Sequence, residues 1–176
     1  MILQQAKNKL GNPSELTLAE IGGLYFWIGL LLLAALLTQQ IIHWRWPWLA
    51  GLQADNVYKQ LSGFALFGFI IHQWRFSVQR AQGNVSKARL MFDRHKMFGA
   101  MAPLLFFMHS QSLGYALTSL LSLTYFWVFL SGLFNGEIIK VRKPFFRPLW
   151  ITLHVGLSMG LLLLLAYHIY ISYAFK

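Results

Sequence analysis

Six histidines are the residues of this chain whose spacing could support chemistry, and four of them form two pairs with the same separation. His95 and His109 are 14 residues apart, and so are His154 and His168. In an α-helix, 14 residues return to within about 40° of the starting direction and rise about 21 Å, so both members of a pair share one face. If the two helices run in the same direction, His95 lies level with His154, and His109 level with His168. The pattern predicts two facing couples of imidazoles.

Facing imidazoles suit a b-type haem, which is held without covalent attachment by two axial ligands. We predict two haem b groups, with His95 and His154 on one iron and His109 and His168 on the other. The irons would lie about 20 Å apart by helix rise, which suits electron transfer across a core of about 30 Å. Structural hydrogen bonding is the alternative use of such histidines. Zinc or copper is a weaker prediction, because each couple supplies two nitrogens and no carboxylate or thiolate is near.

Other residues near the four histidines could serve a haem. Gly99, Gly156 and Gly160 offer room for a flat macrocycle, and Pro103 could bend its helix. His72 could reach the inner haem or a quinone head group, so a quinone is a further possible cofactor, whereas His43 is expected at the interface. A set of basic residues could pair with haem propionates, although topology anchors are their commoner use: Arg45, Arg94, Lys96, Arg142 and Lys143. Apolar packing is the expected use of the methionines that could also ligate iron: Met97, Met101 and Met108.

The elements that must position these residues are predicted to be membrane helices. The chain has 176 residues, of which 57% are hydrophobic and 11% charged, against about 25% charged in soluble domains. Its long uncharged runs lack the alternation of a membrane barrel. We predict an all-α integral membrane protein, a bundle of five transmembrane helices within residues 18–176 after a cytoplasmic tail at 1–17. The predicted helices span about 18–42, 57–77, 95–113, 115–135 and 148–173.

Charge and composition predict the orientation of the bundle. Twelve of the 15 Lys and Arg residues fall in the amino-terminal tail and in the connections after the second and fourth helices. The positive-inside rule then places the amino terminus in the cytoplasm and the carboxy terminus outside. The net charge of +10 is a topological signal on this reading, not a sign of nucleic-acid binding. The absence of cysteine excludes Cys-ligated iron–sulfur clusters and covalent c-type haem. No targeting segment is apparent, which favours a bacterial inner (plasma) membrane.

Several short motifs resemble the ferric reductase-like transmembrane domain. They are Leu61-Ser62-Gly63-Phe64-Ala65-Leu66, Arg80, Asp93-Arg94-His95-Lys96-Met97-Phe98-Gly99, Met108-His109, Trp150-Ile151-Thr152-Leu153-His154 and Tyr167-His168. The resemblance covers about residues 60–172 and implies a haem-binding core there, with His95 and His154 as inner ligands and His109 and His168 as outer ligands. Members of that family commonly have a sixth helix, and many carry a flavin and NAD(P)H domain. The chain has no Gly-rich dinucleotide fingerprint, so electron donor and acceptor are expected to be separate molecules.

Two functions follow as expectations. The first is transmembrane electron transfer by a bis-histidine di-haem b-type cytochrome, as a subunit of a membrane oxidoreductase complex. It would link a quinol or cytoplasmic donor to a redox partner outside. The second is a haem-free membrane anchor or assembly subunit, whose basic loops hold a soluble partner or anionic lipid.

Overall fold

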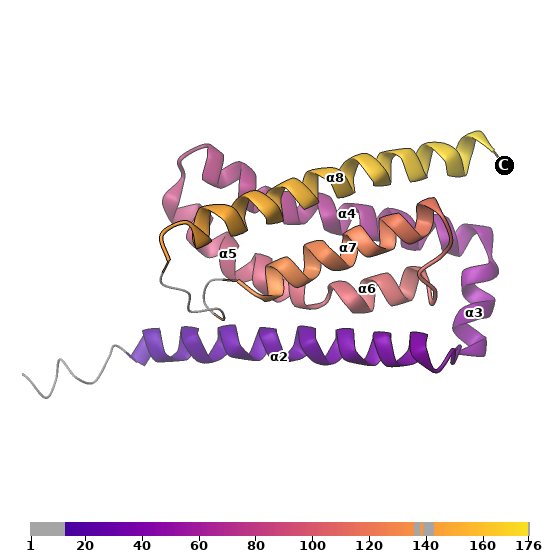
Figure 1. Cartoon of the computed structure of the whole chain (residues 1–176), viewed down its shortest axis with the longest axis horizontal. Helices are drawn as coiled ribbons and strands as arrows, with labels where there is room; N and C mark the ends of the chain where they lie inside the picture. Colours follow the sequence, from indigo (N-terminus) through magenta and orange to yellow (C-terminus); the bar gives the residue numbers. More distant parts are fainter. Residues whose placement is uncertain (1–12, 136–137, 139–142, 176) are drawn as a thin grey trace, which may run out of the picture.

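The described part of the chain is all-helical. The computed structural model describes residues 13–135, 138 and 143–175, with side chains from residue 23 onward. These residues form seven helices and no strand (Figure 1): α2 (Pro13–Ile41), α3 (Pro47–Ala54), α4 (Asn56–Ala81), α5 (Val85–Ala100), α6 (Ala102–His109), α7 (Leu117–Leu133) and α8 (Phe146–Ala174). Most of the predicted tail, together with Lys140 and Arg142, lies outside the described residues.

The long helices lie side by side, and their connections gather at the two ends of the bundle. One end holds the start of α2, the α4–α5 turn and the α7–α8 connection (Figure 1). The other end holds α3, the α6–α7 loop and the carboxy terminus. Helix α4 ends and α5 and α8 begin at the first of these ends (Figure 1). Arg75 and Arg80 in the second half of α4, and Arg147 in the first turn of α8, therefore lie toward this end, which we call the basic end. The connections that were predicted to share one side therefore do so.

The predicted helix at 95–113 is two helices, because the chain breaks beside a proline. Pro103 has no backbone N–H, and its ring disfavours a continuous helix against the turn before it. Helix α5 accordingly ends at Ala100, Met101 caps both segments, and α6 runs from Ala102 to His109. Tyr125 covers the break, since its hydroxyl donates a hydrogen bond of 2.8 Å to the carbonyl of Ala102. The bend expected of Pro103 is thus a full interruption of the helix.

A short helix that the sequence analysis did not predict covers the end opposite the basic end. Helix α3 begins at Pro47, a favoured residue in a first turn, directly after the Trp-rich stretch. Its Gln53 side chain donates to the carbonyls of Phe107 and Met108 at 2.8 and 3.1 Å, and its oxygen accepts from the N–H of Gln111 at 3.2 Å. These bonds satisfy backbone groups at the end of α6, where no helical partner exists. Helix α3 therefore fixes the carboxy-terminal end of α6.

Four of the five predicted helices occur as single helices and the one at 95–113 as two, but they are not five clear membrane spans. Among the described residues, two helices are long and apolar enough to cross a membrane: Gly23–Ile41 within α2, and Phe146–Ala174. Helix α4 has 26 residues, but its second half carries His72, Gln73, Arg75 and Arg80. Helix α7 has only 17 residues, and the α5–α6 pair is interrupted. The sequence analysis predicted five spans of similar length, because uncharged runs do not reveal where a helix breaks.

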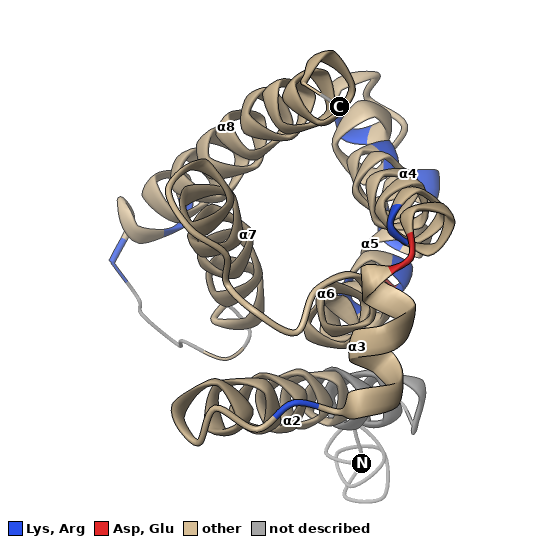
Figure 2. Ribbon diagram, turned by 90° about the vertical axis from the view of Figure 1, so that its right-hand side faces the viewer, with Lys and Arg blue, Asp and Glu red and all other residues tan. Residues whose placement is uncertain are grey.

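The helices surround a cavity. Viewed along the bundle, α4, α5, α6, α7 and α8 form a ring (Figure 2). Helix α8 packs mainly on α7, and α4 packs mainly on α5, α6 and α3. The buried core draws on α2, α4, α6, α7 and α8, with the largest share from α7, and includes Phe106, Phe126 and Phe129. Large apolar side chains point outward instead, as at Trp27 with 65% exposed and Leu163 with 75% exposed.

Candidate functional site

The structure brings the imidazoles of His95 and His154 close together. His95 lies on α5 and His154 on α8, and their ring centroids are 6.2 Å apart with the ring planes at 89°. A metal ion held between two imidazole nitrogens at about 2.0 Å each places the ring centroids about 6 Å apart. The separation of the two rings is compatible with one metal ion between them, and it also lies within the range of about 4.5–7 Å of an edge-to-face pair of rings.

The second couple lies toward the other end of the bundle. His109 is the last residue of α6, and His168 lies in the second half of α8, so both are toward the end opposite the basic end (Figure 1). The structure therefore brings His95 and His154 together, and a contact between His109 and His168 stays a prediction. Their ligation of a haem stays a prediction.

The inner couple borders a cavity large enough for a cofactor. Its volume is about 530 Å³, within the range of about 300–1,000 Å³ of cofactor and ligand sites. The lining includes His95 and His154, the glycines Gly99 and Gly132, and at the basic end Arg80 and Lys96; most of the remainder is apolar or aromatic. Such a lining suits a flat apolar group with anionic substituents at one edge.

Three residues of α7 and α8 fix the ring of His154. Ser131 Oγ lies 2.8 Å from the Nδ1 of His154. The indole of Trp150 stacks on the imidazole, with centroids 5.6 Å apart and planes 7° from parallel, and its N–H donates to the carbonyl of Ser131 at 2.6 Å. A Cβ on Gly132 would lie 3.2 Å from the Cε1 of His154. The absence of a side chain on Gly132 therefore lets the ring lie against the backbone of α7.

His109 has a similar environment on α4. Ser62 Oγ lies 3.1 Å from its Nδ1, and a Cβ on Gly63 would lie 3.2 Å from its Cε1. The carbonyl of Met108, directly before it, accepts from the hydroxyl of Tyr58 at 2.8 Å. The end of α6 is thus held by α4 as well as by α3.

Two buried polar groups beside the inner couple lack partners in the described part of the chain. They are the side-chain amide of Gln73 and the Nδ1 of His95. The His95 Nδ1 lies near the backbone of Gln73 but makes no hydrogen bond of good geometry. Buried polar groups are nearly always satisfied, and Gln73 lines the cavity. The orphaned amide is consistent with a polar group of a bound molecule beside it, so the residues present fit a haem at this position.

The glycines expected to make room for a macrocycle need a correction. Gly99 lines the cavity as predicted. Gly156 and Gly160 do not, because a Cβ on either would meet no atom within 4 Å and neither residue belongs to the cavity wall. Gly132, which the sequence analysis did not single out, takes their place.

The two remaining histidines and the candidate methionines do not line the cavity. His72 borders a separate hollow of about 40 Å³ with Arg75 and Arg94, and this hollow has room for a few waters but not for a quinone ring. His43 lies in the turn after α2 with a φ of 53°. Three methionines are exposed and not held against the couples: Met97, Met101 and Met108.

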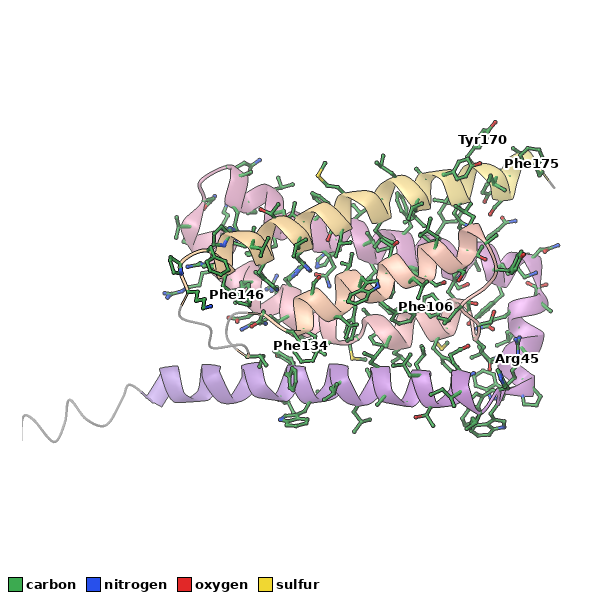
Figure 3. The ribbon with its side chains drawn as sticks, viewed as in Figure 1. Arg45, Phe106, Phe134, Phe146, Tyr170 and Phe175 are labelled. Atoms are coloured by element: carbon green, nitrogen blue, oxygen red, sulfur yellow. The ribbon has the colours of Figure 1, made fainter. Side chains whose placement is uncertain are left out.

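Not all of the basic residues predicted to pair with propionates line the cavity. Lys96 lines the cavity, where it also pairs with Asp93 at 3.1 Å. Arg45 lies at the end of the bundle opposite Phe146 (Figure 3). Lys143 lies over the ring of Phe145, at 5.9 Å from its centroid, and does not border the cavity. Arg80 borders the cavity but was not among the predicted partners.

Among the described residues, no three His, Cys, Asp or Glu side chains come together as a metal-binding group. Comparison with models of protein families, with curated proteins and with solved structures finds no match for this chain. The resemblance to the ferric reductase-like domain therefore remains a prediction.

The sequence analysis missed the functional significance of Ser131, Gly132 and Gln73. A serine followed by glycine occurs at both 62–63 and 131–132. That repeated dipeptide was the only signal in the sequence that could have drawn attention to the pair on α7.

Proposed function

We propose that this chain is a di-haem b-type cytochrome that carries electrons across a membrane within a five-helix bundle. The observation that carries the proposal is the 6.2 Å separation of the His95 and His154 rings on the wall of a 530 Å³ cavity. Bound between two histidines, a haem iron has no open position and supplies one-electron transfer between its ferric and ferrous states.

The chain's own residues hold the cofactor and exclude water. His95 and His154 would be the axial ligands of the inner haem, and His109 and His168 those of the outer haem. Arg80 and Lys96 supply positive charge at the edge of the cavity nearest the basic end, where they would face the propionates. The aromatic and aliphatic lining keeps the rest of the site dry, which raises the weight of these few charges.

The exposed surface supports a membrane location. Large apolar side chains are exposed along α2, α7 and α8, as at Leu31 with 69% and Trp127 with 60% exposed. Monomeric soluble proteins rarely expose so much contiguous apolar surface, whereas lipid accepts it. The positive-inside rule places the basic end in the cytoplasm of a bacterial inner membrane and the carboxy terminus outside.

The proposal includes partners on both sides of the membrane. A haem held by two histidines passes electrons on, so it needs a donor and an acceptor. The proposed donor is a quinol or a cytoplasmic reductase, and the proposed acceptor is a redox partner protein outside, in a hetero-oligomeric oxidoreductase complex.

The test is the haem content of the purified protein. We expect about two b haems per chain by pyridine haemochrome, and loss of one of them in His95→Ala and in His154→Ala. His43→Asn is the matched control, because it removes an imidazole outside both couples at a positive φ that asparagine tolerates. A colourless protein that still co-purifies with a partner would overturn the proposal in favour of a membrane anchor.

A further inference from the structure

Two of the four imidazoles are held by a serine in the same way, although the serines belong to different helices. Ser62 on α4 lies 3.1 Å from the Nδ1 of His109, and Ser131 on α7 lies 2.8 Å from the Nδ1 of His154. One of these histidines belongs to the outer couple and the other to the inner couple. The repeated contact therefore occurs once at each candidate iron position.

The direction of these hydrogen bonds follows from the serine hydroxyls. Ser62 donates to the carbonyl of Tyr58 at 2.8 Å, and Ser131 donates to the carbonyl of Val128 at 2.8 Å. A hydroxyl has a single hydrogen, so an oxygen that has donated it can only accept from a second partner. With the hydroxyl hydrogen directed to the carbonyl, the imidazole donates through Nδ1–H. Neutral imidazole carries one hydrogen, so Nε2 is left with a free lone pair.

A glycine follows each serine and sets the plane of the same ring. A Cβ on Gly63 would lie 3.2 Å from the Cε1 of His109, and a Cβ on Gly132 would lie 3.2 Å from the Cε1 of His154. Carbon atoms prefer a separation of about 3.5–4.0 Å, so only glycine leaves the ring in place. Serine therefore fixes the hydrogen position, and glycine fixes the distance from the helix.

The remaining histidine of each couple has no such support. The Nδ1 of His95 makes no hydrogen bond of good geometry, and the ring of His168 makes no side-chain hydrogen bond to any described residue. Each couple thus joins one imidazole that contacts a serine to one that does not.

We propose that each serine–glycine pair is a positioning unit that fixes the tautomer and ring plane of one haem ligand, leaving Nε2 of His109 and of His154 as the ligating nitrogen. The role in ligation rests on the proposed function, whereas the tautomer does not. Groups that hold a ligating imidazole commonly change metal affinity by about 10–100-fold when they are removed.

The first experiment titrates haem into haem-free protein and compares Ser131→Ala and Ser62→Ala with a matched serine. Ser122 is the control, since it lies on α7 and its hydroxyl also donates to a helix carbonyl, that of Thr118 at 2.8 Å, but it contacts no imidazole. We expect each test variant to bind one of the two haems about 10–100-fold more weakly and Ser122→Ala to bind both as the parent does. Equal affinities in the three variants would overturn the positioning role.

The second experiment reads the tautomer without any haem. Nitrogen-15 NMR of haem-free protein labelled in histidine distinguishes an Nδ1–H from an Nε2–H imidazole. We expect His109 and His154 to be Nδ1–H, and we expect this preference to weaken in Ser62→Ala and Ser131→Ala respectively. An Nε2–H form at both positions in the parent protein would overturn the proposal. If no haem binds but both rings are Nδ1–H, the proposed function fails while the assigned hydrogen bonds stand.

Discussion

Replacing Gly132 with alanine should weaken haem binding while it strengthens the helix. The new Cβ would lie 3.2 Å from the Cε1 of His154. Contact at about 3.5–4.0 Å requires the imidazole to retreat from α7 by roughly 0.5 Å. The residues of a binding site must be held within about 0.5 Å of their productive positions, so this displacement uses all of that tolerance. We therefore expect the inner haem to bind about tenfold more weakly, at the lower end of the loss seen when support for a ligand is removed.

The same substitution should act on folding in the opposite direction. Alanine is favoured over glycine in a helix by up to about 1 kcal/mol, because it restricts the unfolded chain. Haem-free Gly132→Ala should thus unfold at the parent's temperature or slightly above it. General damage to the protein would lower both properties together, so the opposite signs identify a local effect on His154.

The assay combines haem titration with thermal unfolding of the haem-free protein in detergent. Gly156→Ala is the control, since a Cβ there meets no atom within 4 Å and the site faces outward. It should gain the same helix stability and keep full haem affinity. If Gly132→Ala binds haem as tightly as Gly156→Ala does, the close approach of His154 to α7 has no role in binding.

Three further predictions follow from the packing. Tyr125→Phe removes the hydroxyl that donates at 2.8 Å to the carbonyl of Ala102, beside the α5–α6 break. It should lower the free energy of unfolding in detergent by about 1 kcal/mol. The control Tyr115→Phe, at a side chain that is 90% exposed, should leave the free energy of unfolding unchanged. Gln53→Ala should raise amide hydrogen exchange at the end of α6 about tenfold and leave α8 unchanged, because the carbonyl of Phe107 loses its donor and the N–H of Gln111 loses its acceptor. Removing haem should raise exchange in α8 more than in α4, since α8 packs mainly on α7; equal changes in the two helices would contradict this.

The positions of the long helices could be predicted from the sequence because uncharged runs and charged connections mark them directly. The interruption beside Pro103 was foreseen only as a bend, since a proline does not tell whether its helix kinks or ends. Helix α3 was missed because its eight residues are too few to give a clear periodic pattern.

Part of the candidate site could also be predicted from the sequence, and part could not. The couple of His95 with His154 was predicted from the 14-residue spacing within two helices. That spacing lies within one helix only for His154 and His168 on α8, because His95 and His109 belong to α5 and α6. The contacts of Ser131 and Gly132 with His154 depend on how α7 and α8 are rotated against each other, which no local pattern gives. Gly156 was expected to make room for the cofactor for the same reason, and rotation of α8 turns it outward instead.

The packing of α8 mainly on α7 has a consequence for the order of synthesis. A chain made from its amino terminus completes α2 to α6, with His95 and His109 in place, before α7 and α8 exist. The helices that carry His95 and His109 are therefore finished before the helix that carries His154 and His168 is made. If these histidines hold haem as proposed, a haem that arrives between these events would meet an open face and would not need to unwind any helix. The hairpin of α7 and α8 would then supply His154 and His168 together, so one late insertion would complete both sites.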